Sequence, residues 1–179
     1  MGKTYWMLAT THENYEISRA RDFSVQGVEQ GQRRKAVRMA TDDRLLFYVS
    51  DRRAFAASAT LTSDHFEDHE KIWRHHSAAE DFPHRVNLEP TVVVDESSWL
   101  DAGQIGPRME YVRKWPPEWW HLAFVGGLHI LPQRDFSLLE EELRRAAGGG
   151  RKRRRRRRRG RSQAEDSGQH DQLAPAPAD

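Results

Sequence analysis

The chain contains no cysteine, no long apolar run and no fingerprint of a common catalytic fold. Without thiols it has no disulfide framework, no thiolate metal site and no thiol catalysis. No apolar stretch approaches the roughly 20 residues that cross a bilayer, and the N-terminus has no signal-peptide core. The nucleophile elbow, the P-loop and the glycine-rich dinucleotide motif are also missing. We therefore expect a cytoplasmic protein with no membrane contact and no cofactor.

Histidines cluster between residues 65 and 84 and raise the question of a metal site. His65 and His69 are four residues apart, a spacing that places two ligands on one face of a helix. The segment HFEDH has no helix signal, however, and it lacks the glutamate of the HExxH motif. The sequence therefore predicts no metal site.

Positive charge is concentrated near the C-terminus. Residues 151–161 hold 10 of the 29 lysines and arginines, so residues 1–150 carry 19 basic against 23 acidic side chains, a net charge of −4. Ten positive charges within eleven residues would release counterions from DNA or RNA without sequence preference. The alternative is a dispensable low-complexity extension. The ten candidates for backbone contacts are Arg151, Lys152, Arg153, Arg154, Arg155, Arg156, Arg157, Arg158, Arg159 and Arg161.

A domain boundary is expected near residue 147. Phe136, Leu139 and Leu143 share one helical face, and Ser137 with Glu140 fits a capping box. The glycines at 148–150 are expected to stop this helix, and the segment after them has almost nothing apolar to bury. The sequence thus predicts one domain over residues 1–147 and a disordered tail over residues 148–179.

Strand patterns dominate the domain. Residues 5–9 and 44–49 are buried-strand runs, residues 54–62 form a long strand, and residues 86–94 alternate between apolar and polar side chains. Pro90 predicts a bulge or an edge in the last of these. A helix over residues 13–21 would follow an N-cap at Thr11, and further short helices are expected. This order predicts an α+β domain built on a curled sheet or barrel with peripheral helices.

Six short motifs occur in an order that resembles the EVE domain. They are YW-x-x-A-x-x-HEN, VQG, DDR-x-x-FYV, EDHEKIW, EYVRKWPPEWWHLAF and GLHILPQRDF, and the resemblance that they mark extends over nearly all of residues 4–143. This family is a PUA-like relative of the YTH readers of modified bases. The resemblance implies a PUA-like β-barrel and a role in binding a nucleobase.

The resemblance also implies which residues would hold the base. Base readers stack the base on aromatic rings and recognise its edge through polar groups, and aromatic walls favour the positive or apolar character of a methylated base. Trp73 lies where one wall of a YTH pocket stands, while Gln26 occupies the place where many EVE proteins have a second tryptophan. The predicted base-binding residues are Trp73, Thr10, Thr11, Asn14, Phe23 and Gln26.

Each of these residues has a competing structural role at this stage. Trp73 and Phe23 are large aromatic residues of the kind that fill a core, and Thr11 is also the predicted helix cap. Arg85 is expected to form an internal ion pair. Taken together, the sequence predicts a non-enzymatic module that captures a single, modified base of DNA or RNA, with the basic tail adding backbone affinity. Two alternatives remain open: a hydrolase acting on a modified nucleoside, as in the PUA-like ASCH domains, and a structural or partner-binding module. The oligomeric state is not set by the sequence.

Overall fold

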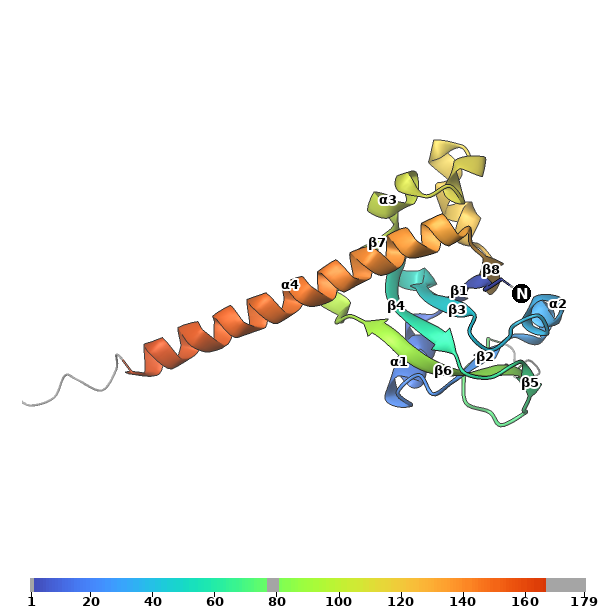
Figure 1. Ribbon diagram of the computed structural model, residues 1–179, viewed down its shortest axis with the longest axis horizontal. Coiled ribbons are helices and arrows are strands. Elements are labelled where there is room, and N and C mark those ends of the chain that lie inside the picture. The colour runs from blue at the N-terminus through green and yellow to red at the C-terminus, as the bar shows by residue number, and fades with distance from the viewer. Residues whose placement is uncertain (1, 77–80, 167–179) are drawn as a thin grey trace, which may run out of the picture. The chain divides into compact units, whose positions relative to one another are not determined.

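The computed structural model describes residues 2–76 and 81–166 (Figure 1). The chain divides into two compact units, Met1–Ala147 and Gly148–Asp179, and the described strands all lie in the first. Among the described helices, none combines the length and the apolar character that crossing a membrane requires.

A curled mixed sheet forms the centre of the first unit, with the strand order β2-β6-β4-β3-β1-β8. β1 and β3 pair in parallel, and the other described pairs, including β5 with β6 and β7 with β4, are antiparallel. This arrangement confirms the predicted α+β fold on a PUA-like curled sheet. The strands are β1 (Tyr5–Thr10), β2 (Val25–Val28), β3 (Arg44–Val49), β4 (Ala54–Leu61), β5 (Phe66–Glu67), β6 (His84–Val93), β7 (Leu100–Asp101) and β8 (Leu128–Ile130).

The central strands are buried on both faces, because side chains alternate between two apolar clusters. Trp6 and Phe47 belong to one cluster, together with Tyr15 of the first helix. Met7 and Leu46 point the other way, into a cluster that includes the apolar face of the last helix. Burial on both faces explains why β1 and β3 are continuous apolar runs in the sequence.

The described part of the chain also forms four α-helices and several short 3-10 turns. The first helix begins as predicted, because the Thr11 hydroxyl accepts a hydrogen bond from the Asn14 N–H at 3.3 Å. The helices are α1 (His12–Ala20), α2 (Arg33–Ala36), α3 (Ala102–Ile105) and α4 (Gln133–Asp166), and the 3-10 turns are Gln30–Gln32, Ser50–Arg52, Glu96–Ser98, Gly106–Arg108, Val112–Lys114 and Pro117–Phe124.

The start of α4 differs from the prediction. The Pro132 carbonyl accepts hydrogen bonds from Asp135 N at 3.0 Å and Phe136 N at 3.1 Å, so the helix begins before Ser137. The predicted capping box is therefore wrong. Its glutamate, Glu140, accepts a hydrogen bond from Ser58 Oγ of β4 at 2.7 Å and also pairs with Arg44 of β3. The predicted apolar face of this helix is confirmed, because Phe136, Leu139 and Leu143 are buried.

The end of α4 also differs. The helix continues to Asp166 rather than stopping at Gly148. Each helical glycine costs about 1 kcal/mol relative to alanine, but glycine keeps the backbone N–H and the arginines that follow are good helix formers. Residues 167–179, the rest of the segment expected to be disordered, lie outside the described residues.

Strand β6 carries the irregularity that Pro90 predicts. Ser58 of β4 pairs with Val92, while the next residue, Ala59, pairs with Pro90, so Thr91 has no partner in the ladder. Proline has no N–H to donate to the neighbouring strand. A bulge at Pro90 therefore breaks no hydrogen bond donated by this residue. The expected bulge is confirmed.

Candidate functional site

A cavity of about 420 Å³ opens where β1 and β3 end. Its volume lies within the roughly 300–1,000 Å³ typical of small-molecule sites. The walls come from the ends of these strands, the first turn of α1, β2, the loop that follows β5, and the segment that precedes β8. Aromatic side chains come from three of these walls, the end of β3, the loop after β5 and the segment before β8: Tyr48, Trp73, His75, His76, Phe82, His121 and Phe124.

The indole of Trp73 is held in place by a chain of three hydrogen bonds. Its Nε1 donates to Ser18 Oγ at 2.8 Å, Ser18 Oγ donates to Gln26 Oε1 at 2.7 Å, and Gln26 Nε2 donates to the Gly27 carbonyl at 2.9 Å. The Trp73 side chain is only 7% exposed. The ring is thus a fixed wall of the cavity, because every polar group along the chain has a partner.

Gly27 allows β2 to approach this ring closely. A Cβ added at Gly27 would lie 2.4 Å from Trp73 Cζ3, 2.6 Å from Trp73 Cε3 and 2.7 Å from Phe82 Cβ. These distances are far below van der Waals contact, so only glycine fits at this position without a shift of the ring or the strand.

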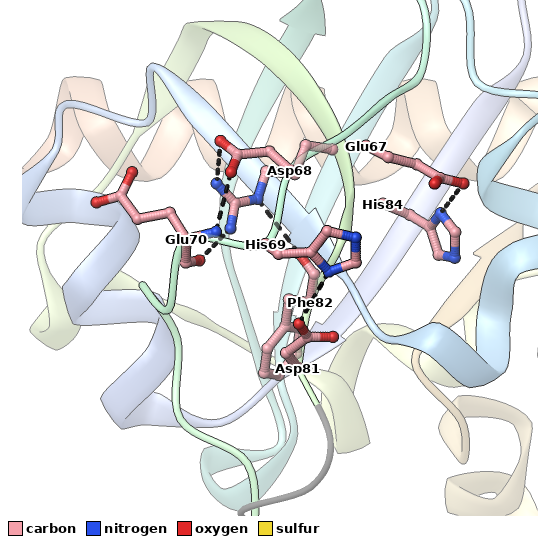
Figure 2. A network of polar contacts seen from close by, with 8 residues as sticks. Glu67, Asp68, His69, Glu70, Asp81, Phe82 and His84 are labelled. Carbon is pink, nitrogen blue, oxygen red and sulfur yellow. Dashed lines mark hydrogen bonds and ion pairs between the residues drawn. The ribbon is translucent and has the colours of Figure 1, made fainter.

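A buried cation lies against the same ring. The Arg85 guanidinium carbon is 5.4 Å from the centroid of the Trp73 ring, within the range of a cation–π contact. The guanidinium donates to three residues that are labelled in Figure 2: Arg85 Nη1 donates to Asp68 Oδ2 at 2.7 Å, Nε donates to the Phe82 carbonyl at 3.3 Å, and Nη2 donates to the Glu70 carbonyl. The predicted internal ion pair of Arg85 is confirmed.

Asn14 fastens the other side of the Trp73 loop. Its Nδ2 donates to the Arg74 carbonyl at 2.8 Å, and its Oδ1 accepts from Arg74 N at 2.8 Å. The amide therefore pairs with the backbone of Arg74 in the same way that two strands pair. This contact ties the loop to the first turn of α1.

The structure brings five of the six predicted base-binding residues to the cavity. Thr10, Thr11, Asn14, Gln26 and Trp73 all line it. Phe23 does not: it is buried in the core, with its ring centroid 5.1 Å from that of Phe47. The amides of Asn14 and Gln26 already have partners within the protein, so their geometry is that of supports for Trp73 rather than of free edge-reading groups.

Two polar side chains that the sequence analysis missed also line the cavity. The Tyr48 hydroxyl makes no hydrogen bond to any described residue, and burial raises the pKa of Tyr48, so this hydroxyl stays protonated and able to donate. The Arg53 side chain is exposed and makes no ion pair with the described part of the chain. The signal for Tyr48 was available, because Ala9 pairs with Tyr48 in the parallel β1–β3 ladder and ligands commonly bind at the carboxyl ends of parallel strands.

His129 holds the wall of the cavity that precedes β8. Its Nε2 lies 3.1 Å from the Gly126 carbonyl, and its Nδ1 lies 2.9 Å from the Tyr111 hydroxyl. A carbonyl only accepts, so Nε2 carries the proton and Nδ1 accepts from Tyr111. Burial lowers the pKa of His129, which favours this neutral form. Gly126 has a φ of +111°, a conformation that glycine adopts freely.

Comparison with known proteins assigns the chain to a family. The EVE domain family matches residues 4–113. The chain belongs to the EVE domain family. A UPF0310 protein of Pyrococcus abyssi is 20% identical over 148 residues, which cover 78% of this chain and 99% of that protein.

Among solved structures, the EVE chain resembles YTH domains in fold. The Mmi1 YTH domain in complex with RNA has a TM-score of 0.54 at 12% identity and covers 80% of this chain and 79% of its own. The YTH domain of the Zygosaccharomyces rouxii MRB1 protein in complex with N6-methyladenosine RNA has a TM-score of 0.55 at 14% identity, with 78% and 86% covered. The predicted relation between the EVE and YTH folds is confirmed.

Proposed function

We propose that the cavity captures a single methylated nucleobase of a nucleic acid strand. The observation that carries this proposal is the fixed Trp73 ring in the cavity wall, held by Ser18 and Gln26 on one side of its loop and by Asn14 on the other. A ring that is already ordered loses little conformational entropy when a base stacks on it. Stacking of one base on an aromatic side chain contributes about 1–3 kcal/mol.

The kinship with YTH domains supports the choice of ligand. Two of the structurally similar YTH domains were solved with RNA, one of them with RNA containing N6-methyladenosine. In the EVE chain the cavity walls offer rings for stacking and two polar groups that have no partner among the described residues, the Tyr48 hydroxyl and the Arg53 guanidinium. The hydroxyl suits an acceptor on the edge of a base, and the guanidinium suits a phosphate or a ring carbonyl.

The basic tail would add affinity that does not depend on sequence. Residues 1–150 are net acidic, so the positive charge needed for phosphate contacts is concentrated at residues 151–161. Each phosphate contact on a single strand adds about 0.7 to the slope of log affinity against log salt. In this proposal the cavity determines which base is bound, and the tail contacts the phosphate backbone.

Binding of short labelled oligonucleotides, followed by fluorescence anisotropy, tests the proposal. The panel contains RNA and DNA with N6-methyladenine, 5-methylcytosine or no modification. We expect the chain to prefer one modified strand, and we expect Trp73→Ala to weaken that complex roughly 5- to 150-fold, the equivalent of the lost stacking energy. Trp115→Ala is the matched control, because this tryptophan is 40% exposed and does not line the cavity.

Two further variants protect the test against a folding artefact. Trp73→Phe keeps a ring in the wall but removes the hydrogen bond to Ser18, and Tyr48→Phe removes only the unpaired hydroxyl. Tyr48→Phe should leave the melting temperature unchanged while reducing discrimination between bases. Equal affinity for all strands, with no change in any cavity variant, would refute base capture. Conversion of the modified base or nucleoside in the same mixtures, followed by chromatography, would support the hydrolase alternative instead.

A further inference from the structure

Three potential metal ligands converge outside the cavity, at the start of β6. The Nε2 of His65, a carboxylate oxygen of Glu67 and the Nδ1 of His84 all lie within 4.8 Å of one another. His65 Nε2 is 3.0 Å from His84 Nδ1, and His84 Nδ1 is 3.7 Å from Glu67 Oε1. Figure 2 shows Glu67 and His84 facing each other. None of the three lines the cavity described above.

The pairing of β5 with β6 produces this convergence. Glu67 and His84 are direct partners in the antiparallel ladder. His65 precedes Glu67 by two residues, and side chains two apart along an extended chain lie on the same side. The His65 N–H also donates to the Met39 carbonyl at 3.1 Å, which fixes the chain just before β5.

The polar atoms of this cluster are not satisfied by hydrogen bonds alone. The two imidazoles share one hydrogen bond, and the 3.7 Å between Glu67 Oε1 and His84 Nδ1 is too long for a second. The Nε2 of His84 is buried and has no partner among the described residues. Nε2 and Nδ1 point in different directions from the imidazole ring, so an ion held at Nδ1 would leave Nε2 as it is, and the fit of a metal rests on the spacing of His65 Nε2, Glu67 Oε1 and His84 Nδ1.

We propose that His65, Glu67 and His84 bind one divalent transition-metal ion of the zinc class. Ligand bonds of about 2.0–2.1 Å in a tetrahedral arrangement place the ligand atoms about 3.3 Å apart, and the 3.0 Å from His65 to His84 and the 3.7 Å from Glu67 to His84 bracket this value. Two imidazoles and a carboxylate form a donor set that suits zinc. Glu67 is about half exposed, so water has access to a fourth position.

A metal at this position would join the two ends of the segment that carries Trp73. Residues 65 and 67 lie before the Trp73 loop and residue 84 lies after it. Closing a loop at its base reduces the number of conformations open to the chain between the ligands. The ion would therefore stabilise the loop, whether or not the cavity binds a base.

One positive side chain competes with a metal ion. Arg33 Nε lies 4.0 Å from Glu67 Oε1, and both side chains are at least half exposed. An exposed ion pair of this length contributes little, so a metal ion would displace it.

Zinc titration of the chelator-stripped full-length chain, followed by calorimetry, tests the site. We expect one ion per chain, and we expect Co²⁺ in its place to give the visible absorption of a tetrahedral complex. H65Q and E67Q should each weaken zinc binding at least tenfold. Even the loss of a residue that only hydrogen-bonds to a metal ligand typically lowers metal affinity 10- to 100-fold. H69Q is the matched control: His69 is four residues from His65, but its side chain is 72% exposed and lies against Asp81.

A second measurement separates the site from a folding defect. Zinc should raise the melting temperature of the unmodified chain and of H69Q, but not that of H65Q, while all three melt alike in the presence of chelator. R33Q should tighten zinc binding, because it removes a competing positive charge. Two outcomes would overturn the proposal: no saturable binding at micromolar zinc, or a loss in H69Q equal to that in H65Q.

Discussion

Replacing Gly27 with alanine tests the idea that β2 holds the Trp73 ring by close contact. The added Cβ would lie 2.4 and 2.6 Å from two atoms of the indole and 2.7 Å from Phe82 Cβ. The ring cannot move away freely, because its Nε1 is hydrogen-bonded to Ser18 and its face lies against Arg85. Overpacking of this kind typically costs about 1–3 kcal/mol.

Thermal and urea denaturation measure this cost directly. A domain of this size loses about 2–4 °C of melting temperature per kcal/mol, so the alanine variant should melt roughly 2–12 °C lower. Gly31→Ala is the matched control, since a Cβ at Gly31 meets nothing within 4 Å. The control should melt within about 1 °C of the unmodified chain, in keeping with the small effects of most surface substitutions.

A double-mutant cycle with Trp73→Ala locates the source of the strain. Two of the three close approaches at Gly27 are to the indole, so most of the cost should disappear once the indole is gone. Residues in contact usually show coupling energies of about 0.5–3 kcal/mol. Equal stability of the Gly27 and Gly31 variants would refute the close contact. A cost that is unchanged in the Trp73→Ala background would refute the role of the ring.

Three further predictions concern the loop, the pH and the tail. Asn14→Ala removes both hydrogen bonds to the Arg74 backbone; it should speed amide hydrogen exchange in the loop and weaken base binding. The folded-state pKa of His129 lies below its unfolded value, so the unfolded state binds more protons than the folded state. The free energy of unfolding, measured with urea, should therefore fall as the pH drops below about 6.5, by at most about 1.4 kcal/mol per pH unit. His129→Gln should show a flatter pH profile, and an equally steep profile would contradict this assignment. Replacing the basic residues of 151–161 with glutamine in the full chain should reduce the salt dependence of binding, by up to about 7 in log–log slope, without changing base preference; an unchanged slope would mean that the tail makes no phosphate contacts.

The parts of the fold that the sequence predicts are those with a strong local signal. β1 and β3 are continuous apolar runs because both faces of each strand are buried, and Thr11 caps α1 through a bond to a residue three positions away. The start of α4 was misplaced, because Ser137 and Glu140 have the spacing of a capping box while Glu140 is engaged by Arg44 and Ser58 from other strands. Contacts with residues so far away in the sequence cannot be predicted from the local spacing of Ser137 and Glu140.

Most of the residues that we selected from the sequence line the cavity, but the sequence did not predict the contacts that these residues make. Order along the chain was enough to bring Trp73, Thr10 and Asn14 to one cavity. The hydrogen bonds that occupy the Asn14 amide cross 60 residues of sequence, and the two histidines proposed as metal ligands are 19 residues apart. The sequence drew attention to His65 and His69, which would meet on a helix; β5 instead pairs with β6 and brings His84 to His65.

Gln26 supports the Trp73 ring and does not itself offer a surface for stacking. At the position where the family resemblance led us to expect a second tryptophan, this chain has a glutamine that is 2% exposed and points its oxygen at Ser18. Ser18 in turn accepts the indole N–H of Trp73. Gln26 therefore acts as an anchor for the remaining tryptophan. A buried amide in this position gives no stacking surface, so a second stacking ring would have to come from another wall of the cavity, such as the wall where the Tyr48 and Phe124 ring centroids lie 4.9 Å apart.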